Sequence, residues 1–416
     1  MGDASEVVKK YVDTTAKITD EGIARMRERI GVVAPGPKAQ DFPALNEYAT
    51  LDGFRHFAYG YGDDNPLWCD EQYGRKSHWR GVIAPPLFLT TMGISETQSI
   101  RPELRSRGAH ALAGVHEFFS GDEWEWFLPT LPGDRMTTRY YLYDVVEKPH
   151  SRFSGGRSLI TKYRVDYLNQ RKELAAVDRY YFVRTERDAA AKTKKNFHIE
   201  RTKYTPEMIK EIEDAYAAEQ VQGSTPRYWE DVKEGESLPQ MVRGPMNTSD
   251  IIAWMRGWGG AYGWRIAWKY RMRRPKFYSL NEWGVPDVVE RGHWEQAWAN
   301  KIGNPYPYDF GRLRSCFLSQ LVSNWMGDTA WFWKMSNQFR QFNYLGDTTW
   351  VRGKVLKKQI DEDGHHLVDI DMWCENQRGE VTAPGKATVI LPSREAGPVV
   401  LPKPSAKTEG TVPLLY

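Results

Sequence analysis

The sequence predicts a mixed α+β protein of two similar halves, each with helical sequence followed by strand-like stretches. Its 416 residues suffice for two domains that each bury a core. The order of helical and strand-like segments begins again after about 190 residues, as in an internal duplication. An aromatic strand that ends in a Gly-Asp turn also occurs twice, at Gly133-Asp134 and at Gly346-Asp347.

The elements follow in order along the chain. Residues 1–45 predict an N-terminal helical arm, because apolar residues recur there at close to 3.6 spacing. Residues 187–226, rich in Ala, Lys, Glu and Asp, predict a linker between the first domain, 46–186, and the second, 227–395, before a tail at 396–416. Period and composition predict strands at 113–128, 136–146, 158–168, 172–182, 335–342, 348–356, 366–375 and 381–391, and helices at 250–270 and 313–331.

Composition narrows the class of protein. A net charge of only +3 argues against a nucleic-acid partner. No apolar run reaches membrane-spanning length and the start lacks a signal pattern, so we expect a soluble cytoplasmic protein with no membrane partner. The three cysteines are too widely spaced for a disulfide framework or a metal site, and no dinucleotide fingerprint is present, so no metal or cofactor is expected.

Two segments have the look of two copies of one site. The first reads Asp63-Asp64-Asn65-Pro66-Leu67-Trp68-Cys69-Asp70 and is followed by Ile83-Ala84-Pro85-Pro86 and an expected helix. The second reads Asp287-Val288-Val289-Glu290-Arg291-Gly292-His293-Trp294-Glu295 and is followed by Tyr308-Asp309-Phe310-Gly311. Only the second copy contains a histidine, which suggests that one half performs chemistry and the other holds substrate.

These segments resemble the signature of the MaoC-like acyl dehydratases and (R)-specific enoyl-CoA hydratases, Asp-x-Asn-Pro-x-His-x-Asp followed by Ile-Ala-His-Gly. In the first half Trp68 stands at the histidine position and Pro85-Pro86 replace His-Gly. In the second half His293 matches and Phe310-Gly311 fall at His-Gly, but Asp287 lies six residues before the histidine where the family has five. The resemblance covers most of the chain.

The resemblance implies a tandem (double) hotdog, in which each half is an antiparallel sheet wrapped around a long central helix. It further implies an acyl-CoA thioester bound where the halves meet, CoA present only as part of the substrate, and a homodimer. The expected activity is that of a hydro-lyase which reversibly hydrates a 2-enoyl-CoA. A thioesterase and a non-catalytic acyl-binding subunit of a heteromeric hydratase remain alternatives.

The catalytic prediction names His293 and Asp287 as the pair that activates water, and Gly311 as the amide that meets the thioester oxygen at a helix N-terminus. Phe310 and Arg312 are expected to contact substrate. The plainer interpretation has His293 on a polar surface loop, Asp287 in a turn and Asp309 as a helix N-cap.

In the first half an indole at Trp68 cannot relay protons, because its N–H only donates. That half is expected to be structural or to bind the acyl group, with Asp63, Asn65 and Trp68 in its site and the first two also holding the loop by hydrogen bonds. An independent site made by Asp63 with His56 or His78 is the alternative.

A cluster of basic residues is expected either to contact the CoA phosphates or to form a solvated face. It consists of Arg271, Arg273, Arg274 and Lys276. The neighbouring tryptophans are expected in a tunnel or, more simply, in the core. They are Trp254, Trp258, Trp264 and Trp268.

Overall fold

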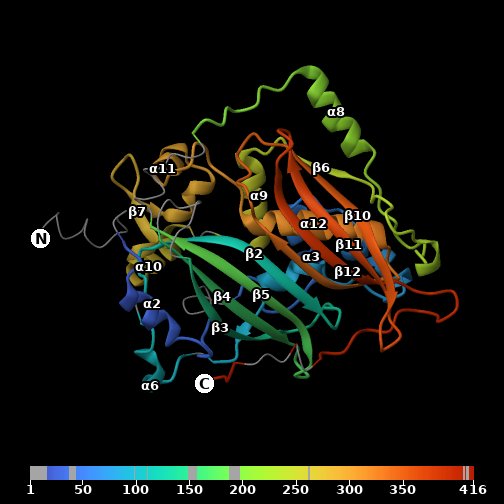
Figure 1. Ribbon diagram of the computed structural model, residues 1–416, viewed down its shortest axis with the longest axis horizontal. Coiled ribbons are helices and arrows are strands. Elements are labelled where there is room, and N and C mark those ends of the chain that lie inside the picture. Colours follow the sequence, from blue (N-terminus) through green and yellow to red (C-terminus); the bar gives the residue numbers. More distant parts are fainter. Residues whose placement is uncertain are drawn as a thin grey trace, which may run out of the picture.

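The computed structural model describes residues 16–36, 44–97, 99–109, 111–148, 157–186, 197–260, 263–405, 408 and 412–416. Within these residues the two halves share one ten-stranded sheet, in the order β1-β3-β4-β5-β2-β9-β12-β11-β10-β6 (Figure 1). The halves join where β2 pairs antiparallel with β9, from Gly121 opposite Gln338 to Glu125 opposite Lys334. The backbone ladder therefore runs unbroken from one half into the other.

The eight strands expected from the sequence are confirmed to within a few residues. The first half contains β2 (His116–Trp126), β3 (Thr137–Lys148), β4 (Ser158–Leu168) and β5 (Leu174–Thr185). The second contains β9 (Trp331–Gln338), β10 (Thr349–Ile360), β11 (His366–Asn376) and β12 (Val381–Ile390). All pairings among these eight strands are antiparallel, which confirms the tandem hotdog.

The second half is built around helix α12 (Gly311–Met326), in which every residue from Arg312 onward is buried. The helix packs against β9, β10, β11 and β12 and also against β2 of the first half. The helix begins directly after Phe310 and ends at Gly327. The φ of Gly327 is +79°, a value that glycine adopts without steric cost.

The prediction of a long central helix in the first half is wrong. Its place holds η1 (Pro86–Thr91), a six-residue 3₁₀ helix. Pro85 is extended and Pro86 occupies the first helical position, so a helix can begin there. It is stopped at Met92-Gly93, because Gly93 has a φ of +120° and lies against Thr138 of β3.

The helix predicted for 250–270 is two helices, α9 (Thr248–Trp258) and α10 (Trp264–Arg273). Gly259 caps α9 in the left-handed conformation, with a φ of +86°, which ends the first helix. α9 packs against α3 (Leu51–Gly60) at two glycines, where a methyl group on Gly257 would lie 2.4 Å from the His56 carbonyl.

Of the predicted N-terminal arm, α2 (Asp20–Arg27) is described, and the expected helical residues before 16 lie outside the described residues. The predicted linker contains α8 (Pro206–Ala217). No helix in the described ranges is long and apolar enough to cross a membrane. The remaining elements are α4 (Pro66–Cys69), α5 (Glu71–Lys76), β1 (Ile94–Ser95), α6 (Pro102–Arg105), η2 (Trp229–Asp231), β6 (Met241–Arg243), η3 (Pro275–Phe277), β7 (Tyr278–Leu280), β8 (Pro286–Val288), η4 (Val289–His293) and α11 (Gln296–Lys301).

Two pairs of turns have the same hydrogen bonds in both halves. The Asp134 carboxylate accepts the Leu131 N–H at 2.8 Å, and the Asp347 carboxylate accepts the Tyr344 N–H at 2.9 Å, as expected of capping aspartates. The segments Asn169-Gln170-Arg171-Lys172-Glu173 and Asn376-Gln377-Arg378-Gly379-Glu380 form matching turns, in which the asparagine oxygen accepts two backbone N–H groups. The internal repeat is thus visible in atomic detail.

Candidate active site

His293 ends η4 and is half-buried between two aromatic rings. Its ring stacks on Phe310 at 3.7 Å and meets Tyr308 edge-on at 4.8 Å. Its Nδ1 lies 2.7 Å from the Tyr308 carbonyl oxygen, and because a carbonyl only accepts, Nδ1 must carry the proton. In the neutral ring Nε2 therefore has a lone pair with which to accept a proton.

Burial lowers the pKa of His293 to about 4, and hydrogen bonds to the backbone carbonyls of Tyr308 and Asp309 oppose that shift only in part. The imidazole is consequently neutral at physiological pH. A neutral ring with a fixed tautomer is the form that a general base requires.

The N-terminus of α12 adjoins this imidazole. Phe310, on which His293 stacks, is the N-cap residue and makes no side-chain cap, and Gly311 is the first helical residue. The leading N–H groups of a helix have no partner within it and favour negative charge. The structure therefore brings together three of the predicted residues, His293, Phe310 and Gly311.

Gly311 is also sterically constrained. A methyl group there would lie 2.9 Å from Phe339 of the second half and 3.1 Å from Phe119 of the first. The start of α12 is thus in contact with both halves, at a position where only glycine fits without movement of an aromatic ring.

Asp287 is not hydrogen-bonded to His293. It lies in β8, where its carboxylate accepts the Val288 N–H at 2.7 Å and its carbonyl accepts from Arg291 at 3.0 Å. Asp309 is not the N-cap of α12, since that position is held by Phe310, and the Asp309 carboxylate pairs with the buried Arg314 at 2.8 Å. Burial raises the pKa of Asp309 to about 6, and Arg314 opposes the shift.

Arg312, expected at the substrate, is buried in the core. Its guanidinium donates to Asp122 of β2 and to Asp178 of β5, the latter at 3.0 Å, and lies 4.6 Å from the Phe119 ring centre. Burial raises the pKa of both carboxyl groups and the arginine opposes it. These aspartates, which the sequence did not single out, tie the first half to the start of α12.

The first-half motif is held inside the protein. Asp63 accepts the Asn65 N–H at 3.0 Å, and Asn65 accepts the Leu67 N–H at 3.0 Å, so the expected loop hydrogen bonds are present. Trp68 is 2% exposed and packs in the core. The other partner of the Asp63 carboxylate is the Tyr61 hydroxyl at 2.9 Å, and neither His56 nor His78 contacts it.

An aromatic cluster extends from Gly311 across the first half. Its rings are half-buried and stand 5.4 to 6.0 Å from their neighbours. All but one belong to strands of the first half, whose own helix at this place is the short η1. The members are Phe119, Tyr140, Tyr163, Tyr180, Phe182 and Phe339.

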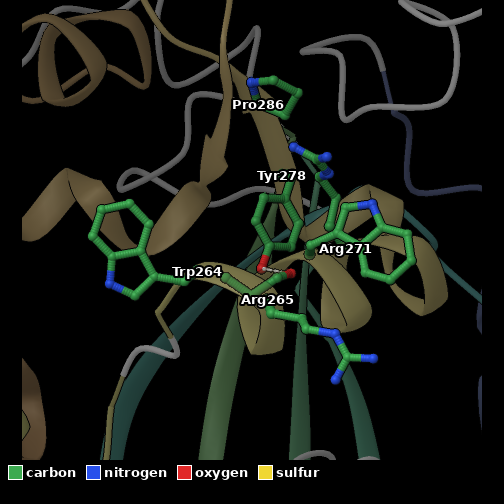
Figure 2. A pocket seen from close by; sticks show the side chains of 7 residues that line it. Trp264, Arg265, Arg271, Tyr278 and Pro286 are labelled. Carbon is green, nitrogen blue, oxygen red and sulfur yellow. Dashed lines mark hydrogen bonds between the residues drawn. The ribbon is translucent and has the colours of Figure 1, made fainter.

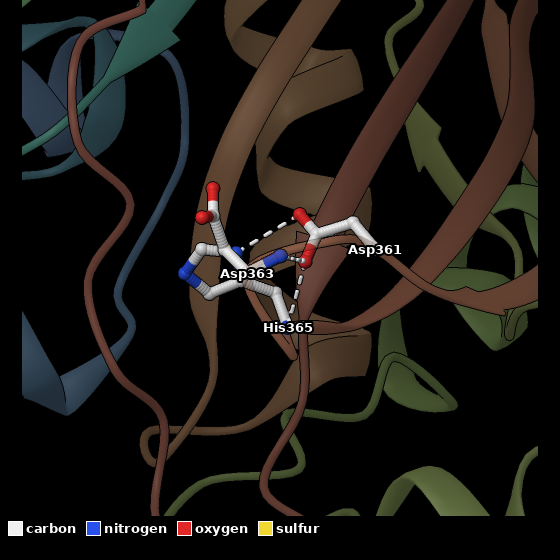
Figure 3. Close-up of side chains that lie close together, drawn as sticks. All are labelled: Asp361, Asp363 and His365. Carbon is white, nitrogen blue, oxygen red and sulfur yellow. Dashed lines mark hydrogen bonds and ion pairs between the residues drawn. The ribbon is translucent and has the colours of Figure 1, made fainter.

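One group of side chains has ligand atoms close enough for a metal ion among the described residues. Asp361, Asp363 and His365, in the turn between β10 and β11, place such atoms within 4.8 Å of one another (Figure 3). The Asp361 carboxylate accepts the backbone N–H groups of Asp363 and His365 and contacts His365 Nδ1 at 2.9 Å. These contacts hold the turn, and they account for the cluster without an ion.

Comparison with known proteins agrees with this architecture. A family model described as FAS1-like, dehydratase domain region matches residues 47–176. Among solved structures, a MaoC-like dehydratase is 14% identical, with a TM-score of 0.58, and 88% of this chain and 99% of that chain are covered. No curated protein matches the sequence.

Two further solved structures are similar at lower scores. A MaoC-like dehydratase from Phytophthora capsici is 11% identical, with 84% of this chain and 98% of that chain covered and a TM-score of 0.44. The peroxisomal multifunctional enzyme type 2 from Drosophila melanogaster is 10% identical, with 82% and 47% covered and a TM-score of 0.45. The matched model and the fold together support a dehydratase or hydratase reaction in general terms.

Proposed function

We propose that this chain, a member of the MaoC-like dehydratase family, catalyses the reversible hydration of a 2-enoyl-CoA thioester. One observation carries the proposal. The imidazole of His293 is neutral, donates through Nδ1 to the Tyr308 carbonyl and stacks on the residue that precedes the first amide of α12. A proton acceptor and an anion-stabilising helix N-terminus are thereby adjacent.

In the proposed reaction His293 Nε2 takes a proton from water as the water oxygen bonds to the β-carbon. The electron pair of the double bond moves toward the thioester carbonyl, whose oxygen becomes negative near the Gly311 N–H. The proton then returns to the α-carbon, so that one water is consumed and one 3-hydroxyacyl thioester is formed. Dehydration follows the same path in reverse.

Asp287 keeps the proposed role of carboxylate partner for the water. Its side chain is bound to the Val288 N–H, and a rotation about its own side-chain bonds would be needed to reach the imidazole. Asp287→Asn, with His293 intact, tests whether this carboxylate helps to activate the water. A lower turnover number supports that role, and an unchanged one shows that the carboxylate only holds the Val288 N–H.

The acyl group is proposed to lie on the aromatic cluster that begins at Gly311. Half-buried rings supply apolar surface beside the helix start, and two of them, Phe119 and Phe339, lie directly against Gly311. The first half would then bind the substrate on which the second half acts, and Asp63, Asn65 and Trp68 would support that half from within. Truncating Phe119, Tyr180 or Phe182 to alanine is expected to raise KM.

The experiment is a panel of 2-enoyl-CoA and 3-hydroxyacyl-CoA substrates, followed by the absorbance of the conjugated thioester. Loss of that absorbance with no release of CoA thiol supports hydration. Release of free thiol would identify a thioesterase, in which the same water attacks the carbonyl carbon. Binding without turnover of any panel member would instead indicate an acyl-binding subunit.

We also propose that the chain acts in the cytoplasm as a homodimer. All three cysteines are free and buried, as suits a reducing compartment. Light scattering coupled to size-exclusion chromatography measures the mass, and a single 48.1 kDa species would contradict the dimer.

A further inference from the structure

A surface hollow of about 450 Å³ lies beside α10. Figure 1 shows α10, β7 and α11 gathered at one end of the molecule, and Figure 2 shows side chains of the hollow arranged around Tyr278. Two tryptophans, one tyrosine and two arginines line it, together with an alanine and a proline. The lining residues are Trp264, Arg265, Ala267, Trp268, Arg271, Tyr278 and Pro286.

Neither tryptophan of the hollow belongs to the core. Trp264 is 96% exposed and Trp268 is 50% exposed. Trp264 also has a φ of +52°, a left-handed conformation in which a bulky side chain is uncommon. Backbone strain of this kind clusters at ligand-binding positions, and two exposed indoles leave flat apolar surface available to a ligand.

Basic groups dominate the α10 side of the hollow, while the carboxylates of Asp287 and Glu290 act on the Tyr278 phenol. α10 begins without a side-chain cap or an acidic residue in its first turn, and Arg265 stands there although the helix N-terminus is already positive. The Nε atom of Arg271 is buried and has no hydrogen-bond partner among the residues that the structure describes. Residues 264–276 contain no Asp or Glu, whereas their basic residues are Arg265, Lys269, Arg271, Arg273, Arg274 and Lys276.

We infer that this hollow binds the phosphorylated adenosine end of CoA, an inference that rests on the proposed function. Trp264 and Trp268 offer faces on which a purine base stacks, and Arg265 and Arg271 offer planar donors for phosphate oxygens. An aromatic base that carries phosphates is the chemistry that matches indoles and guanidinium groups around one hollow.

The hollow is linked to the proposed catalytic residues through one layer of side chains. Tyr278, which lines it, forms a hydrophobic cluster with Tyr270 and Val288, and Trp294 packs against that cluster. Trp294 directly follows His293. A nucleotide anchored here would direct the long pantetheine arm toward the imidazole and the start of α12.

The test measures binding of adenosine 3′,5′-bisphosphate to the full chain by titration calorimetry. Trp268→Ala and Arg271→Gln are each expected to raise the dissociation constant about tenfold, because the first removes a stacking contact and the second a phosphate contact. The matched control is Arg256→Gln, which removes an exposed arginine from the neighbouring helix α9 and is expected to leave the constant within about twofold.

A kinetic measurement separates this inference from the proposed hydratase activity. For a substrate of the panel, Trp268→Ala should raise KM with the CoA thioester and leave KM unchanged with the N-acetylcysteamine thioester, which lacks the nucleotide. Unchanged melting temperatures of both variants confirm that the effect is local.

Failure of the nucleotide site and failure of the proposed hydratase activity give different results. If the wild-type chain does not bind the bisphosphate, or if the variants bind it equally well, the inference is overturned even when hydration is observed. If the bisphosphate binds, the variants weaken it and no thioester is hydrated, the nucleotide site stands and the proposed function fails.

Discussion

The two halves of this protein share their turns but differ in the helix that each sheet surrounds. In the second half α12 has 16 residues and starts at Gly311, beside a half-buried histidine. In the first half η1 has six residues, and the residue at the histidine position is Trp68, 2% exposed. Duplication has therefore preserved the contacts that connect strands, whereas the segment that carries chemistry has diverged.

This difference assigns separate work to each half. The first half lacks an equivalent of α12, and half-buried aromatic rings lie on its strands near the start of that helix. Asp122 and Asp178 of the first half also hold Arg312, one residue after Gly311. The half without the histidine thus supports the geometry of the half that has it.

The largest expected effect comes from His293→Asn. Asparagine cannot take a proton from water, so the turnover number should fall roughly a hundred- to ten-thousand-fold while substrate still binds. Single-turnover kinetics and a direct binding titration measure the two quantities. Turnover that survives in the variant would show that the second half is not the catalytic one.

Trp68→His restores the family histidine to the first half. We expect no second activity, tested in the background of His293→Asn, because this position is enclosed in the core. Loss of the buried indole should lower the free energy of unfolding by about 3 kcal/mol. Urea denaturation measures it, with Trp283→His, at an 85% exposed position, as the control that changes little.

Gly311→Ala tests the start of α12. The added methyl group would press on Phe339 and Phe119 and shift the amide, so kcat should fall roughly ten- to hundredfold with little change in folding. Gly81→Ala is the matched control, because a methyl group there meets no atom within 4 Å. Equal activities of the two variants would remove Gly311 from the proposed site.

The matching turns make a smaller test. Lys172 and Gly379 occupy the same position with φ of +66° and +75°. Gly379→Lys should lower the free energy of unfolding by about 1 kcal/mol, and Lys172→Gly should raise it slightly, because a lysine is strained in this conformation. Denaturant titration of both variants measures the changes, and shifts of the same sign would contradict the equivalence of the turns.

A fall in pH changes the stability contributed by His293 of the second half and by Asp63 of the first half in opposite directions. The pKa of His293 is lowered to about 4, so kcat/KM should stay level from pH 8 to about pH 5 and reach half its value near pH 4. In the folded state this depressed pKa costs stability as pH falls from the unfolded value toward 4. A pH profile that bends near 6.5 would indicate an exposed imidazole.

Burial raises the pKa of Asp63 to about 6, so the stability that this carboxyl contributes is complete below about pH 4 and is lost as pH rises toward 6. Asp63→Asn should make the melting temperature less dependent on pH between about pH 4 and pH 6, and should leave the pH dependence of kcat/KM unchanged. Calorimetric scans at several pH values measure the first effect.

Strand positions and capping turns could be predicted from the sequence because they depend on neighbours within a few residues. The Gly-Asp turn at Asp134 and its copy at Asp347 are such local features. The short helix of the first half was missed, although Pro85-Pro86 and Gly93 bracket it, because the resemblance favoured a long one.

The environment of Arg312 could not be predicted in the same way. Its partners are 190 and 134 residues away in sequence, in strands of the other half. The available signal was weak, namely a carboxylate at Asp122 in phase with the buried Trp124 and Trp126 of one strand. The family resemblance suggested a partnership between Asp287 and His293, but it did not reveal that the Asp287 carboxylate would bind the next N–H along the chain.

The two edge strands of the shared sheet are very short. β1 offers two residues at one edge and β6 three at the other. The strands beside them are much longer, because β1 pairs with only two residues of β3, and β6 pairs with only three residues of β10. Single bridges from Ile30 and Ala34 to β3, and from Ser237 to β10, occupy further positions along these strands. Short segments of this chain therefore stand at the two edges where another chain could otherwise add backbone hydrogen bonds.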